Sequence, residues 1–68
     1  MTVISQVKQT LTGLQSAQAT LKLYEVQSQN KETKKVYQEI IDTTDEIIKD
    51  LEGRIKTLEY EEPQYKGL

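Results

Sequence analysis

Apolar side chains recur every three or four residues along almost the whole chain of 68 residues, and this spacing constrains the fold more than any other feature. It matches the 3.6-residue turn of an α-helix, whereas no useful length of sequence shows the period of two that a strand requires. In the first half these positions are Val3, Val7, Leu11, Leu14, Ala17, Leu21 and Tyr24. In the second half they are Tyr37, Ile40, Thr44, Ile47, Leu51, Ile55 and Leu58, widened by Ile41 and Ile48. The pattern predicts an all-α protein built from two helices.

The apolar pattern lapses at the polar residues 27–30, which separate the two predicted helices. We expect helix one at about residues 3–28, with Thr2 as its N-cap, and helix two at about residues 31–61, with Asn30 as its N-cap. Pro63 disfavours helix in the residue before it, so residues 63–68 are expected to form an irregular tail. Because so short a connection makes the helices antiparallel, residues 1–62 are predicted to form a helical hairpin.

The second apolar stripe is wide, and two helices side by side are expected to leave Ile41, Ile48 and Ile55 open to water. A second hairpin would cover that surface. We therefore predict a homodimer, a four-helix bundle with Ile41, Ile48, Leu51 and Ile55 in the dimer core.

The composition excludes several classes of chemistry. The chain contains no His and no Cys, which removes thiol nucleophiles, disulfides, His-based acid–base catalysis and the usual zinc sites. A net charge of −2 argues against nucleic-acid binding. No run approaches the ~18 apolar residues that span a bilayer, and the first residues do not resemble a signal peptide. We expect no catalytic residues, no cofactor, no direct membrane insertion and a cytoplasmic location.

Glu39, Asp42 and Glu46 are spaced to share one face of the second helix. Helical bundles use such carboxylates to bind metals, but the di-iron sites of that kind also use His. A solvated acidic surface is therefore the favoured interpretation, and a metal- or small-ligand-binding bundle remains the alternative function.

Four tyrosines are the only aromatic residues. Tyr24 and Tyr37 flank the predicted turn and are expected to pack together. Tyr60 and Tyr65 lie on either side of Pro63, where they could fold the tail back onto the bundle or form an exposed epitope for a partner. Both readings remain open.

Several segments resemble the family called domain of unknown function 1657: TVISQVKQTL at residues 2–11, SAQA at 16–19, QSQNKE at 27–32 and EEPQYK at 61–66. The resemblance covers nearly the whole chain, with Thr33 in place of a commoner Ala. It implies a protein of endospore-forming Firmicutes encoded beside spore membrane proteins, and it carries no catalytic residues.

We therefore predict a non-enzymatic helical interaction protein associated with sporulation. It would act in the forespore or spore core, or at the inner spore membrane. Its partner would be a spore membrane protein, bound through a face of the bundle or through residues 60–68.

Overall fold

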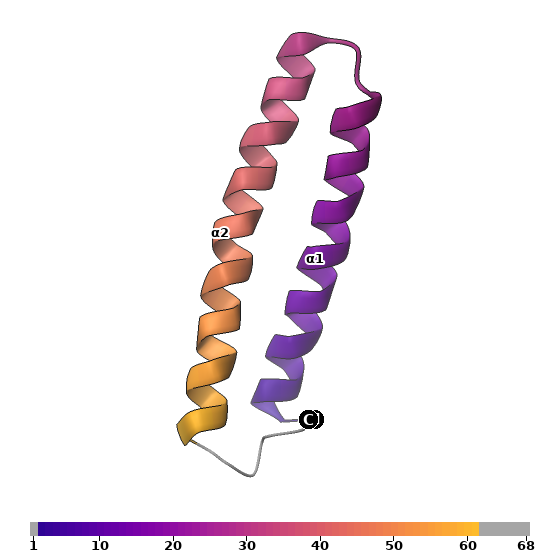
Figure 1. The fold of residues 1–68 in the computed structure, drawn as a ribbon. Coiled ribbons are helices and arrows are strands. Elements are labelled where there is room, and N and C mark those ends of the chain that lie inside the picture. The colour runs from indigo at the N-terminus through magenta and orange to yellow at the C-terminus, as the bar shows by residue number, and fades with distance from the viewer. Residues whose placement is uncertain (1, 62–68) are drawn as a thin grey trace.

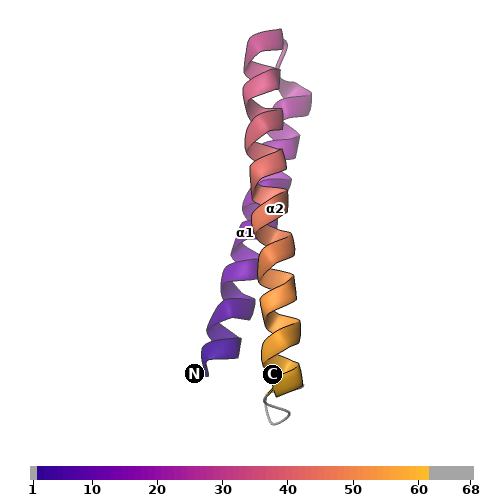
Figure 2. The same cartoon turned by 90° about the vertical axis from the view of Figure 1, so that its left-hand side faces the viewer.

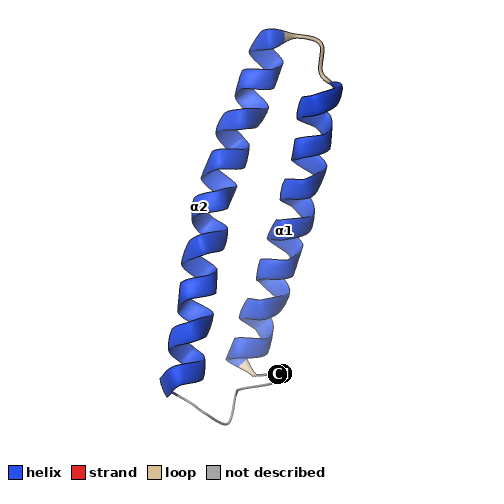
Figure 3. Cartoon of the chain, viewed as in Figure 1, coloured by secondary structure: helices blue, strands red, loops and turns tan. Residues whose placement is uncertain are grey.

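The computed structural model describes residues 2–61, which form two antiparallel α-helices joined by a short turn (Figure 1, Figure 3). Helix α1 spans Val3–Gln27 and helix α2 spans Lys31–Glu61. The predicted all-α hairpin is confirmed. The chain extends 49 × 17 × 13 Å along its principal axes. The view turned by 90° shows that the two helices cross at a shallow angle (Figure 2).

Both helices begin at the caps that the sequence predicts. The Thr2 hydroxyl accepts a hydrogen bond from the Ser5 N–H, with an N–O distance of 3.2 Å. The Asn30 side chain accepts from the N–H groups of Glu32 and Thr33, at 2.8 and 3.1 Å. Helix α1 ends one residue earlier than expected because Ser28 is extended, with φ −72° and ψ 134°. These contacts satisfy N–H groups that have no partner inside the helices.

In each helix, the residues that face the other helix are spaced by strictly alternating steps of three and four residues. In α1 the buried and half-buried positions of this repeat are Ile4, Val7, Leu11, Leu14, Gln18, Leu21 and Glu25. In α2 they are Tyr37, Ile41, Thr44, Ile48, Leu51, Ile55 and Leu58. An average step of 3.5 residues is the spacing of a coiled-coil seam. The hairpin is thus a short antiparallel coiled coil, and its buried apolar residues are Ile4, Ile41, Ile48 and Ile55.

The expectation that Ile41, Ile48 and Ile55 stay open to water within one hairpin is wrong. Their exposed fractions are 8%, 6% and 7%, because they occupy inward positions of the seam and pack against α1. The preceding isoleucines, Ile40 and Ile47, are the outward ones, with exposed fractions of 40% and 43%.

The same shift of one position occurs in α1. Val3, Ala17 and Tyr24, which belong to the predicted stripe, are exposed, whereas Ile4 and Gln18 are buried. The inward-facing stripe of each helix is therefore narrower than predicted, and part of the predicted stripe faces outward.

Candidate functional site

The seam between the helices has two open sides, and the structure places different residues along each. On one side Val7 lines an open groove with Leu51, Arg54 and Leu58. On the other side Lys8 and Leu11 line a groove with Glu59 and other α2 residues. The 3.5-residue repeat extends both sets along the rod.

We call the first set the apolar side: Val3, Val7, Thr10, Leu14, Ala17, Leu21 and Tyr24 of α1 with Tyr37, Ile40, Thr44, Ile47, Leu51, Arg54 and Leu58 of α2. We call the second set the charged side: Lys8, Leu11, Gln15, Gln18, Lys22 and Glu25 of α1 with Gln38, Asp45, Glu52, Ile55 and Glu59 of α2.

An ion pair between the helices lies on the charged side, and an ion pair within α2 lies further along the rod. The Lys8 ammonium is 3.9 Å from a Glu59 carboxylate oxygen, and both side chains are about 30% exposed. Further along, the pKa of Asp45 is lowered, chiefly because Lys49 donates to its carboxylate, with an N–O distance of 3.3 Å. A hydrogen bond from Gln18 and the positive charge of Lys22 lower it further. This side therefore contributes electrostatic matching between α1 and α2.

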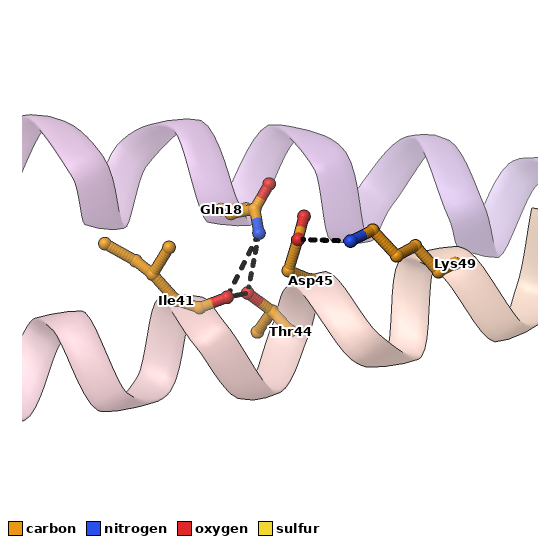
Figure 4. A network of polar contacts seen from close by, with 5 residues as sticks. All are labelled: Gln18, Ile41, Thr44, Asp45 and Lys49. Atoms are coloured by element: carbon orange, nitrogen blue, oxygen red, sulfur yellow. Dashed lines mark hydrogen bonds and ion pairs between the residues drawn. The ribbon is translucent and has the colours of Figure 1, made fainter.

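Gln18 is the buried polar side chain of the seam (Figure 4). Its Nε2 atom donates to the Ile41 carbonyl oxygen at 3.2 Å and to the Thr44 hydroxyl oxygen at 3.1 Å. Thr44 in turn donates to the same Ile41 carbonyl at 2.8 Å. Within residues 2–61 no buried side-chain nitrogen or oxygen lacks a hydrogen-bond partner. A polar residue at such a position fixes the register in which two helices pair, so this network ties α1 to one register on α2.

The apolar side of α1 carries no charge along its length. All three charged residues of this helix, Lys8, Lys22 and Glu25, belong to the other side of the seam. Thr10 is exposed on the apolar side, and its hydroxyl already donates to the Gln6 carbonyl at 3.1 Å. Covering this flank of α1 would desolvate no ionised group, and burying an ionised group without a partner is costly.

The apolar side of α2 adds large exposed side chains. Ile40 and Ile47 lie outward on it, and Val36 continues the exposed surface toward the turn. The charged residues that line the groove on this flank are Lys49, Asp50 and Arg54. Lys49 pairs with Asp45 at 3.3 Å, and Arg54 pairs with Asp50 at 2.8 Å. That contact raises the pKa of Arg54.

The two ends of the apolar side differ in shape. Near the chain termini an open groove of about 700 Å³ runs beside Val7, Leu51, Arg54 and Leu58. At the turn end the rings of Tyr24 and Tyr37 pack with their centroids 6.1 Å apart and their planes tilted by 50°. The predicted contact between these tyrosines is confirmed.

The residues predicted for other roles lie elsewhere. Glu39, Asp42 and Glu46 are exposed, and nowhere in residues 2–61 do three carboxylates form a group that could hold a metal ion. No observation favours the metal-binding alternative. Tyr60 lies in the last turn of α2 and is 85% exposed, whereas Tyr65 lies outside the described residues.

Sequence reasoning missed the division of the hairpin into two sides. The feature that could have revealed it is the seven-residue repeat of Ile4, Leu11 and Gln18. Its third member is polar, so a search for apolar residues does not recognise that Gln18 faces inward. The charge-free flank of α1 is also visible in the sequence once that repeat is known.

Within the described part of the chain, neither helix is long and apolar enough to cross a membrane. No curated protein and no solved structure matches the chain. Residues 7–55 match a protein family described as a protein of unknown function, DUF1657. Because that match covers well over half of the sequence, the chain belongs to the DUF1657 family.

Proposed function

We propose that this chain is a non-enzymatic helical interaction protein whose apolar side binds a second copy of the same hairpin, giving a four-helix bundle. The observation that carries the proposal is the charge-free flank of α1 beside the exposed Ile40 and Ile47 of α2. The lack of His and Cys in the chain supports a role without catalysis.

The hairpin by itself buries little apolar surface. Four apolar side chains of the described residues are buried, one on α1 and three on α2, and all of them lie in the seam between the helices. Chains below ~70–80 residues seldom obtain enough stability from one small core, and association is a common remedy. Pairing two apolar sides would remove Ile40 and Ile47 of both copies from water, at about 25 cal/mol per Å² of apolar area.

The dimensions of the rod also suit a dimer. A face of 49 Å by 17 Å has a projected area of about 830 Å². A standard stable interface buries about 800 Å² on each partner. One long face of the hairpin is thus large enough for a specific homodimer.

The dimer core proposed here differs from the one predicted from the sequence. Ile40, Ile47 and Ala17 would lie at its centre, with the half-buried Leu51 at the edge of the seam. The seam isoleucines, such as Ile48, stay within each hairpin.

Two matched substitutions in α1 test the proposal. Ala17 and Ala19 are both exposed in the same helix, but Ala17 lies at the middle of the apolar side and Ala19 lies outside it. Ala17→Glu places an unpaired carboxylate in the interface, whereas Ala19→Glu leaves it in water with the same change in helix propensity.

In sedimentation equilibrium at micromolar concentration, wild type and Ala19→Glu should be dimers and Ala17→Glu a monomer that retains its helical circular dichroism. A monomeric wild-type chain, or identical dimers for both variants, would reject the proposal.

We further propose, on the resemblance described above, that the protein acts in sporulation with a spore membrane protein, in the forespore or spore core. The exposed Tyr60 supports a contact with such a partner through residues 60–68. A deletion strain should show altered spore heat resistance or germination, and a copy lacking residues 60–68 should fail to restore it. Normal spores from the deletion strain would reject the spore role, and full rescue by the truncated copy would reject the role of residues 60–68.

A further inference from the structure

The groove at the terminal end of the apolar side combines apolar and charged lining residues. Val7 of α1 and Leu51 and Leu58 of α2 supply apolar side chains. Asp50 and Arg54, which pair at 2.8 Å, line the groove on α2. An open groove of about 700 Å³ with this lining suits an occupant with an apolar body and a polar tip, which is the character of a tyrosine side chain.

Helix α2 ends on the same face as this groove. Glu61, its last residue, follows Leu58 by three positions and Arg54 by seven, and residues at these spacings lie on one face of a helix. Tyr60 lies about 100° away around the helix and is 85% exposed. The chain beyond Glu61 therefore starts beside the groove, whereas Tyr60 lies outside it.

The residues that follow Glu61 have the length to reach the groove. Residues 62–68 lie beyond the described part of the chain, and their sequence is EPQYKGL. Pro63 is favoured at the second position of a β-turn, so the sequence of residues 62–65 suits a reversal of the chain. Leu58 and Arg54 lie about 4.5 and 10.5 Å back from Glu61 along the helix axis, whereas four extended residues span at most about 13–14 Å. The link from Glu61 to Tyr65 is thus long enough.

We propose that Tyr65 binds in the groove of its own hairpin, with its ring against Val7 and Leu58 and its hydroxyl toward the Asp50–Arg54 pair. Its own chain is favoured over another copy, because a link of four residues holds Tyr65 beside the groove at an effective concentration in the millimolar range. The apolar residues at the terminal end of the rod would then be covered within one chain.

The contact does not depend on the dimer proposed above. That dimer is centred on Ala17, Ile40 and Ile47, whereas the groove lies nearer the chain termini. The contact also leaves the exposed Tyr60 available to a partner. The two proposals can therefore fail separately.

Two matched tyrosine substitutions in the full chain test the contact. Tyr65→Ala should lower the melting temperature by about 4–8 °C, because partial burial of an aromatic ring is lost from a chain of this size. Tyr60→Ala, which removes an exposed ring, should not lower it. Equal melting temperatures for wild type and Tyr65→Ala would overturn the proposal.

Protein concentration separates an intramolecular contact from binding in another copy. The loss caused by Tyr65→Ala should be the same at tenfold higher concentration and in the Ala17→Glu background, whether or not Ala17→Glu dissociates a dimer. A loss that grows with concentration, or that disappears in Ala17→Glu, would place Tyr65 on a second copy and overturn the assignment to its own chain.

A double-mutant cycle locates Tyr65 on the helix. Arg54 and Lys56 are both exposed cations of α2, but Arg54 lines this groove and Lys56 lines the groove on the charged side. In Arg54→Ala the effect of Tyr65→Ala should fall to about half or less, and in Lys56→Ala it should be unchanged. Equal effects of Tyr65→Ala in both backgrounds would overturn the placement in this groove.

Discussion

Replacing Ile48 by alanine tests whether the stability of the hairpin comes from its seam. Ile48 is 6% exposed and lies midway along the inward row of α2. Truncating an isoleucine at such a site costs about 2–5 kcal/mol, from lost transfer energy and from the cavity that remains. The seam is shallow and its neighbours can relax into the gap, so we expect about 3 kcal/mol. A chain of this size has a total stability of about 3–10 kcal/mol, so this one change removes a large share of it.

The matched control is the same substitution one position earlier. Ile47 is 43% exposed, and Ile47→Ala is expected to cost about 1 kcal/mol, mostly through weaker association. Urea unfolding followed by circular dichroism, with all three chains at the same concentration, measures both values. Equal costs for the two substitutions, or a larger cost at Ile47, would refute the assignment of Ile48 to the seam.

Three further predictions follow from individual residues. Gly53→Ala should raise the melting temperature and add about 1 kcal/mol to the free energy of unfolding, because alanine favours the helix and its Cβ would meet no atom within 4 Å. A lower melting temperature would contradict this. The lowered pKa of Asp45 means that its contribution to stability is present above its ordinary value of 3.8 and is lost as the pH falls through the lower, folded value. Thermal melts at pH 5 and pH 2 should therefore show a smaller acid-induced loss for Asp45→Asn than for wild type, and equal losses would argue against the contact with Lys49. Gln18→Leu should change the free energy of unfolding by less than about 1 kcal/mol, because Thr44 keeps its own hydrogen bond and apolar burial offsets the lost ones; a loss above about 3 kcal/mol in urea would show that the network dominates the seam.

The helices, their caps and the turn were predictable because each depends on residues close together in sequence. Thr2 and Asn30 lie directly before periodic apolar segments, and the side chain of each accepts hydrogen bonds from N–H groups two or three residues later. The residues between Gln27 and Lys31 are too few to connect anything other than antiparallel neighbours. Local rules therefore fix the hairpin.

The inward face was not predictable from one helix alone. Ile40 and Ile41 are about 100° apart around α2, and both fit a broad stripe of period 3.6. Only pairing with α1 selects Ile41 for the seam and leaves Ile40 exposed. In α1 the apolar spacing predicts that Ala17 faces inward and excludes the neighbouring Gln18, because Gln18 is polar. The structure shows the reverse, since Gln18 is buried among hydrogen-bond partners on α2.

Which residues of α1 lie on the apolar side depends on how α1 is rotated about its own axis. If α1 were turned by one residue, Ala17 and Val3 would enter the seam, and the surface proposed for the second copy would lose its small central residue. Because Gln18 finds its two acceptors at Ile41 and Thr44, it stabilises the rotation that keeps Lys8 and Lys22 on the other side. A lone hairpin gains nothing from a charge-free flank, since an exposed lysine there would be fully hydrated, whereas a dimer would have to desolvate every charge on that flank. The buried glutamine and the distribution of charge on α1 are therefore explained together if the apolar side is an interface.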